Sequence, residues 1–116
     1  IYGLVSPDYL IYKKAKFVNP ISYGCSKASI IHLSKYLATS KQFKKIRVNS
    51  ISPGPFPAPK VQANEPEFIE RLSVKVPLRR IGQGPEIGGP VVFLTSSAAS
   101  FVTGANLVVD GGWTSW

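Results

Sequence analysis

Cysteine and histidine are scarce in this 116-residue chain, which carries one of each, Cys25 and His32. A disulfide framework and a cysteine-built zinc site both need several thiols, so the single cysteine excludes them and fits a reducing compartment. His32 has no companion histidine or carboxylate cluster, so we expect no metal site. Both residues are expected to be ordinary members of a helix, with Cys25 in a packing role.

Long apolar runs are missing as well. No stretch approaches the roughly 18 consecutive apolar residues that a membrane-spanning helix needs. Neither end shows a charged segment followed by an apolar run and a small-residue cleavage site. The sequence therefore predicts a cytoplasmic protein without a membrane partner.

Acidic residues are few, since 6 Asp and Glu stand against 14 Lys and Arg, and the formal net charge is +8. Such a charge fits an anionic partner such as nucleic acid, or a chain that is half of a protein. Most of the positive residues precede Lys60 and lack the interleaved arginines and aromatics of a base-stacking surface. We therefore interpret the charge as a solvated face or an imbalance between halves, and expect no nucleic-acid partner.

The first part of the chain contains a loop-like segment and one long helical pattern. Residues 1–20 show no sustained period and are expected to form a surface loop. Apolar residues then recur at three-to-four spacing and predict a helix over 22–40. Pro20 discourages a backward extension of this helix, and Ser22 is the expected N-cap.

The second part alternates between strand and helix patterns. Its predicted elements are a strand over 46–52, an irregular proline-rich stretch to about Asn64, a helix over 65–74 capped by Asn64, a helix over 85–97 and a strand over 106–109. Strands separated by helices imply a parallel pair, buried between helical layers. Two strands do not complete such a layer, so the sequence predicts an α/β fold that is incomplete alone.

A tyrosine and a lysine four residues apart share one face of a helix and can form a proton-transfer pair. Three pairs have this spacing in the chain, namely Tyr9/Lys13, Tyr12/Lys16 and Tyr23/Lys27. The spacing alone does not choose among them. Only Tyr23/Lys27 lies at the start of the predicted long helix over 22–40.

Five sequence blocks, in order and spacing, resemble the C-terminal half of the short-chain dehydrogenases/reductases. They are Tyr23-Gly24-Cys25-Ser26-Lys27-Ala28, Ile46-Arg47-Val48-Asn49-Ser50-Ile51-Ser52-Pro53-Gly54-Pro55, Pro77-Leu78-Arg79-Arg80-Ile81-Gly82, Phe93-Leu94-Thr95-Ser96-Ser97, and Thr103-Gly104 with Val108-Val109-Asp110-Gly111-Gly112. The resemblance covers nearly the whole chain. It implies that residues 1–116 are the C-terminal part of a Rossmann-like doubly wound parallel sheet, with the last two strands and their flanking helices.

The resemblance further implies an NAD(P)-dependent oxidoreductase that interconverts an alcohol and a ketone, with Tyr23 as the general acid/base. A free phenol is a poor base at neutral pH, and an ammonium nearby, here that of Lys27, favours the phenolate. In this family the lysine also holds the nicotinamide ribose. The expected catalytic residues are Tyr23 and Lys27, and the expected residues for NAD or NADP are Tyr23, Lys27, Pro53, Gly54, Pro55 and Phe56.

The chain departs from the family pattern at one position of this cofactor turn. Family members usually place a threonine two residues after the position of Phe56, where this chain has Ala58. One hydroxyl group that would bind the cofactor in the family is therefore missing at this position. A proline-rich turn without any ligand is the alternative reading of Pro53 to Phe56.

Several family features are expected upstream of this sequence. The substrate-binding serine of the family would directly precede Ile1, and the Gly-rich dinucleotide loop would lie further upstream. We therefore expect the N-terminal half of the same protein as a partner, a homodimer or homotetramer paired through the long helix, and little activity of this chain alone.

The segments on the substrate side follow from the same resemblance. Residues 1–20 are expected to form an active-site or substrate loop, and residues 55–80 a substrate-side loop with short helices. The positive, aromatic loop suits an anionic or sugar-nucleotide substrate, and the expected substrate is a small alcohol or carbonyl compound such as a sugar or sugar-nucleotide. The alternatives are a catalytically silent fragment that acts only in assembly, or a basic nucleic-acid-binding module.

Overall fold

The computed structural model describes residues 1–13 and 18–116. Its helices and strands follow in the order α1 (Ile21–Thr39), β1 (Ser50–Pro53), α2 (Pro59–Asn64), α3 (Pro66–Lys75), α4 (Gly88–Thr95) and β2 (Asn106–Val109). Single 3-10 turns lie between and after these elements, at Lys41–Phe43, Gly84–Ile87, Ser97–Ala99 and Trp113–Ser115.

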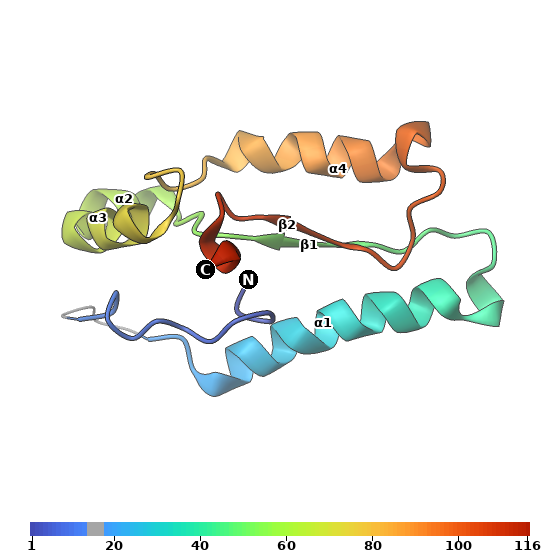
Figure 1. Ribbon diagram of the computed structural model, residues 1–116, viewed down its shortest axis with the longest axis horizontal. Coiled ribbons are helices and arrows are strands. Elements are labelled where there is room, and N and C mark those ends of the chain that lie inside the picture. The colour runs from blue at the N-terminus through green and yellow to red at the C-terminus, as the bar shows by residue number, and fades with distance from the viewer. Residues whose placement is uncertain (14–17) are drawn as a thin grey trace.

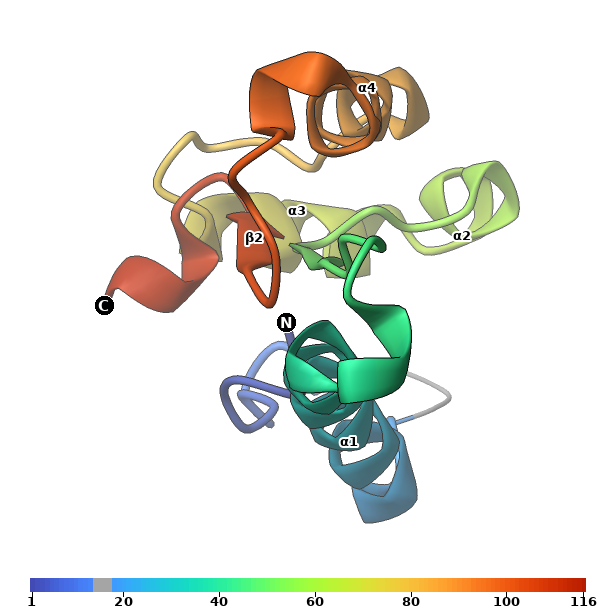
Figure 2. The ribbon, with the colours of Figure 1, turned by 90° about the vertical axis from the view of Figure 1, so that its right-hand side faces the viewer.

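The two strands form a parallel pair between helical layers, as the sequence predicts. Ser50 is paired with Asn106 and Pro53 with Val109, so both strands end at the same edge. Helix α1 lies on one side of the pair and α4 on the other, while α2 and α3 lie beyond the ends of the strands (Figure 1). Figure 2 shows the same layers end on. The polypeptide leaving β1 therefore enters the region of α2 and α3.

Helix α1 begins one residue earlier than expected, and its expected N-cap is wrong. Pro20 occupies the N-cap position with an extended backbone, no side chain caps the helix, and Ser22 lies within the first turn. The Pro20 carbonyl accepts from the Tyr23 N–H at 2.9 Å, so the main chain satisfies this helix start. Further along, Ser34 is buried and its hydroxyl donates to Ser50 Oγ at 3.2 Å, which ties α1 to β1.

Strand β1 is shorter than the alternating pattern predicts, because side chains bind the residues before it. Val48 N donates to Thr103 Oγ1 at 3.1 Å, and Asn49 exchanges hydrogen bonds with Ala105 N at 3.0 Å and Val102 O at 2.9 Å. Residues 46–49 are thus held to the other segment without joining the strand ladder. Asn49 therefore supports the approach of the two segments through hydrogen bonds.

The proline-rich stretch is partly helical, contrary to expectation. Helices α2 and α3 begin at Pro59 and Pro66, where the missing N–H of proline costs nothing and its fixed φ suits a helix. The cap of α3 is Glu65 rather than Asn64. The predicted helix over 85–97 divides into a 3-10 turn at Gly84–Ile87 and α4, whereas β2 has the predicted bounds.

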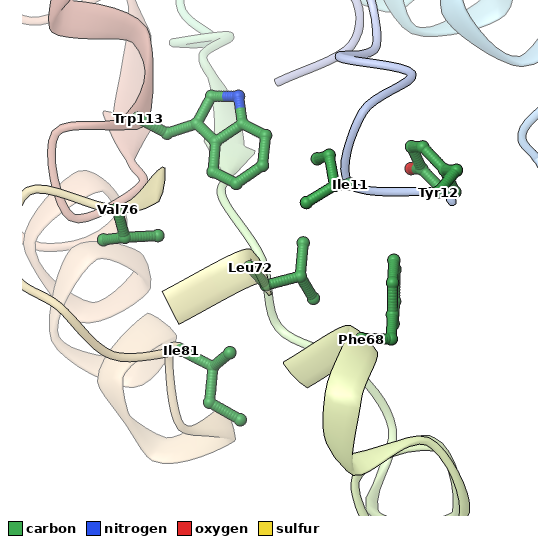
Figure 3. Packing of buried hydrophobic residues seen from close by; sticks show 7 residues of the cluster. All are labelled: Ile11, Tyr12, Phe68, Leu72, Val76, Ile81 and Trp113. Carbon is green, nitrogen blue, oxygen red and sulfur yellow. The ribbon is translucent and has the colours of Figure 1, made fainter. Parts of the chain in front are cut away.

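Residues 1–13 contain no helix or strand, as expected of a loop, but two of their side chains belong to the main apolar core. Ile11 and Tyr12 are 4% and 7% exposed and pack with residues of α3 and of the C-terminal segment (Figure 3). Arg71 Nε donates to the Ile11 carbonyl at 2.8 Å, and Lys75 Nζ lies 2.8 Å from Asp8 Oδ2. This segment is therefore held on α3.

The molecule is less compact than is usual for a domain of its length. Its radius of gyration is 15.9 Å, whereas a compact domain of this size is expected near about 13 Å. Apolar side chains stay exposed on α1 at Ile30 and Leu33 and on α4 at Val91 to Phe93. Within the described residues, no helix has both the length and the apolar character that crossing a membrane requires.

Gly54 allows the two strand ends to meet, and its replacement tests this packing. A Cβ at Gly54 would lie 2.5 Å from the Cα of Asp110, whereas one at Gly84 would meet nothing within 4 Å. We expect Gly54→Ala to lower the free energy of unfolding by about 1–3 kcal/mol, because backbone must move. Urea unfolding of the complete protein that contains this chain measures the change.

Gly84→Ala is the matched control and is expected to change the free energy of unfolding by less than about 0.5 kcal/mol. Equal unfolding midpoints for the two variants would show that the strand ends do not depend on Gly54.

Candidate active site

Tyr23 and Lys27 lie in the first two turns of α1 and face each other. The Lys27 Nζ atom is 5.1 Å from the centroid of the Tyr23 ring. Four residues complete about one helical turn, which places both side chains on one face. The phenol and the ammonium are thus close enough for the positive charge to act on the ring.

The reactive atoms of both side chains are available to a ligand. Within the described part of the chain, neither the Tyr23 hydroxyl nor the Lys27 ammonium makes a hydrogen bond, and both residues are exposed. The other tyrosine and lysine pairs differ. Tyr9 lies in a turn rather than a helix, the Tyr12 hydroxyl is bound to Tyr2, and Lys16 lies outside the described residues.

The turn after β1 joins Tyr23 at one cavity. This cavity has a volume of about 220 Å³. Its lining includes Tyr23 and the whole turn from Pro53 to Phe56, together with Ile1, Tyr2, Tyr12, Asn19, Pro57, Val61, Phe68, Leu72 and Trp113. The structure therefore brings together all of the predicted site residues except Lys27, which lies beside Tyr23 on α1 but is not among the lining residues.

The main chain of Phe56 is free to bind an amide. No hydrogen bond within the described residues uses its N–H or its carbonyl. The neighbouring Pro55 carbonyl accepts from Gly82 N at 2.9 Å, and a Cβ at Gly82 would lie 2.4 Å from the Phe56 ring. Gly82 thus braces the turn, while one donor and one acceptor at Phe56 remain open to a ligand carboxamide.

Gly54 has a packing role that the sequence analysis does not give it. Its N–H donates to the Val109 carbonyl at 2.9 Å, and its Cα hydrogens lie against Asp110. The absence of a side chain is therefore needed for contact between the strand ends. The expected role of Gly54 in cofactor binding stays a prediction.

Asp110 holds the C-terminal segment against the cavity. Its carboxylate accepts from Gly112 N and Thr114 N, both at 2.8 Å, and from Thr114 Oγ1 at 2.7 Å. Burial raises the pKa of this carboxyl, but the three donors outweigh burial and hold it below its usual value. This loop places Trp113, 3% exposed, in the cavity wall.

The cavity wall also includes Tyr2, Tyr12 and Asn19, which no sequence pattern indicated. The hydroxyls of Tyr2 and Tyr12 lie 2.7 Å apart, and Asn19 Nδ2 donates to the Tyr12 hydroxyl at 3.4 Å. The Tyr2 ring meets the Tyr23 ring edge to face, with 6.4 Å between centroids. Their position in a loop without a period gave no signal for this arrangement.

Gly3 brings this N-terminal segment up to α1. A Cβ at Gly3 would lie 2.6 Å from the backbone of Lys27 and Ala28, so only glycine permits the approach. The two residues of α1 given ordinary helix positions, Cys25 and His32, are exposed. The packing role expected for Cys25 is therefore not found among the described residues of this chain.

Comparison with known proteins identifies the family. Residues 8–114 match the family model described as enoyl-(acyl carrier protein) reductase. The isoepoxydon dehydrogenase of Aspergillus clavatus is 45% identical over 102 residues, and the NADH-dependent L-xylulose reductase of Ambrosiozyma monospora is 44% identical over 103. These alignments cover 80% and 84% of this chain but only 38% of each relative.

A solved structure gives the same result. The short-chain dehydrogenase of Leptospira borgpetersenii with bound NAD⁺ superposes with a TM-score of 0.84 at 42% identity, covering 97% of this chain and 41% of that one. The chain thus spans well under half the length of the relatives that it matches. It belongs to the short-chain dehydrogenases/reductases and corresponds to their C-terminal part.

Proposed function

We propose that the complete protein containing this chain is an NAD(P)-dependent oxidoreductase that interconverts an alcohol and a ketone by hydride transfer, with Tyr23 as general acid/base. The observation that carries the proposal is the free Tyr23 hydroxyl in one cavity with the turn from Pro53 to Phe56, beside the Lys27 ammonium. The names of the relatives, a dehydrogenase and a reductase, support it.

Tyr23 moves the proton in the proposed reaction. In reduction its hydroxyl donates to the carbonyl oxygen of the substrate, and in oxidation its phenolate accepts the proton of the alcohol. Lys27 places a positive charge 5.1 Å from the centroid of the Tyr23 ring, beside the oxygen that exchanges the proton. Half-exposure of the ring lets a substrate oxygen reach the hydroxyl.

The nicotinamide cofactor would supply or accept the hydride when bound. The open N–H and carbonyl of Phe56 match the acceptor and donor of a carboxamide, and Pro53 to Pro55 hold that main chain at the carboxyl end of β1. Lys27 would hold the nicotinamide ribose. Ala58 has no hydroxyl group to bind the cofactor.

Two segments form the proposed substrate side of the site. Residues 1–20 contribute Tyr2, Tyr12 and Asn19 to the cavity, and residues 55–80 contribute Val61, Phe68 and Leu72. Relatives are named for L-xylulose, D-arabinitol and isoepoxydon. These names support a small alcohol or carbonyl substrate of the sugar type, rather than a sugar-nucleotide.

The proposed partners follow from the short coverage of the relatives. An N-terminal half would extend the sheet along the free edge of β1, and apolar side chains on α1 would pair subunits into a dimer or tetramer. The same exposed residues, Ile30, Leu33 and Tyr36, favour the second candidate function, a silent fragment that acts only in assembly.

Tyr23→Phe separates the two candidates. In the complete protein we expect this variant to lower kcat by at least about 10²-fold, the scale of general acid/base catalysis, because the phenol is removed while the ring stays. The dissociation constant of NAD(P)H, measured by fluorescence titration, is expected to stay within about twofold, given that an exposed hydroxyl is lost.

Tyr9→Phe is the matched control, because Tyr9 is 67% exposed and lies in a turn. It is expected to keep full turnover. Retained turnover in Tyr23→Phe would contradict the role assigned to Tyr23.

Lys27→Ala tests the second half of the pair. Loss of the ammonium removes the charge beside the phenol and one contact to the cofactor. We expect kcat/KM to fall about 10²-fold and cofactor affinity about tenfold, which corresponds to roughly 1.4 kcal/mol. Steady-state kinetics and NAD(P)H titration of Lys27→Ala and of the exposed control Lys13→Ala measure both effects, and equal values for the two variants would refute the proposed role.

A further inference from the structure

The hydroxyls of Tyr2 and Tyr12 carry one proton each, and the hydrogen bond between them uses only one of the two. Each phenol carries one O–H and two acceptor sites, and the Asn19 amide already donates to Tyr12. If Tyr12 donates to Tyr2, the Tyr2 proton is unused. If Tyr2 donates to Tyr12, the two acceptor sites of Tyr12 are filled and the Tyr12 proton is unused.

Neither arrangement offers this remaining proton an acceptor within residues 1–13 and 18–116. Tyr12 is buried, Tyr2 is partly buried, and both line the cavity that contains Tyr23. An oxygen atom of a ligand in the cavity can accept this proton in place of water.

The pair is held in place before any ligand arrives. The Tyr12 ring lies 5.5 Å from the Phe68 ring, and its neighbour Ile11 accepts a hydrogen bond from Arg71 Nε at 2.8 Å. The ion pair of Asp8 and Lys75 fixes the start of the same segment on α3. Such bracing spares a ligand the cost of ordering its binding groups.

The Tyr2 phenol is a neutral donor at physiological pH in this setting. Burial, followed by the hydrogen bond to Tyr12, raises the pKa of Tyr2 well above its usual range. Tyr2 therefore does not compete with Tyr23 for a proton. It offers hydrogen bonding without acid/base chemistry.

The rest of the cavity wall suits a carbon skeleton rather than a charge. Phe56, Val61, Leu72 and Trp113 are apolar, and no Lys, Arg, Asp or Glu lies among the described lining residues. An anionic group placed here would lose hydration and would find no cationic side chain among the described lining residues to balance its charge. The volume of about 220 Å³ is below the roughly 300–1,000 Å³ of pockets for drug-sized ligands.

We propose that the hydroxyls of Tyr2 and Tyr12 select the substrate, by donating to a second, uncharged oxygen on a small ketone or alcohol whose reacting carbon lies at Tyr23. The substrate class is thus a compact hydroxyketone or diol, not a carboxylate or phosphate. The inference rests on the proposed function, since it assigns the reacting carbon to Tyr23.

Three ketones with the same ring test the inference in the complete protein. Cyclohexanone has only the reacting carbonyl, 2-hydroxycyclohexanone adds a neutral hydroxyl, and 4-oxocyclohexanecarboxylate adds a charge. Binding is measured in the Tyr23→Phe variant with NAD(P)H by the fluorescence of Trp113, in the cavity wall, with exposed Trp116 replaced by Phe. Turnover is measured separately in the protein that keeps Tyr23.

We expect the hydroxyketone to bind about tenfold more tightly than cyclohexanone, the factor for roughly 1.4 kcal/mol, and the carboxylate to bind more weakly than both. The double variant Tyr2→Phe/Tyr12→Phe should bring the first ratio close to one. Each single variant should lower it partly, because the remaining phenol keeps a proton. Tyr9→Phe, in the same segment, should leave the ratio unchanged.

The outcomes separate this inference from the proposed function. Preferred binding of the hydroxyketone that the double variant abolishes supports the inference, and absent turnover would then count against the oxidoreductase alone. Equal binding of the ketones, or a preference that survives in the double variant, overturns the inference even where both ketones are turned over. Tightest binding of the carboxylate overturns it too.

Discussion

The contact between Gly54 and Asp110 is the constraint on which the site depends. Parallel strands end at the same edge, and the chain must then turn away from both ends without a clash. Here the turn from Pro53 to Phe56 passes so close to Asp110 that a Cβ at Gly54 has no room. Beyond this contact, the chain that leaves β1 continues to α2 and α3, and the chain that leaves β2 continues to Trp113.

Asp110 gives this contact a second consequence. The same residue that closes on Gly54 uses its carboxylate to bind the backbone of Gly112 and Thr114. The loop so formed turns Trp113 into the core beside α3, where it meets Leu72 (Figure 3). A backbone contact between strand ends and a buried carboxylate therefore build one wall of the cavity together.

The remaining walls come from segments far apart in the sequence. Gly3 lets the N-terminal segment lie against the backbone of α1, which puts the Tyr2 ring beside Tyr23. Arg71 and Lys75 of α3 bind Ile11 and Asp8 of the same segment. The segment thus bridges the helix that carries the phenol and the helices beyond the strands, and the cavity lies between them.

The sequence by itself determined helix α1, strand β2 and the shared helix face of Tyr23 and Lys27. The helical period, the strand alternation and the four-residue helix spacing depend only on residues close in the sequence. The positions of α1 and β2 and the contact between Lys27 and Tyr23 therefore follow from these local patterns. Only the tertiary structure decided that Tyr2, Tyr12, Asn19 and Trp113 share the cavity, that β1 is short, and that Gly54 serves packing. These features arise from contacts between residues up to about a hundred positions apart, such as Ile1 and Trp113 at one cavity, and no local pattern encodes such contacts.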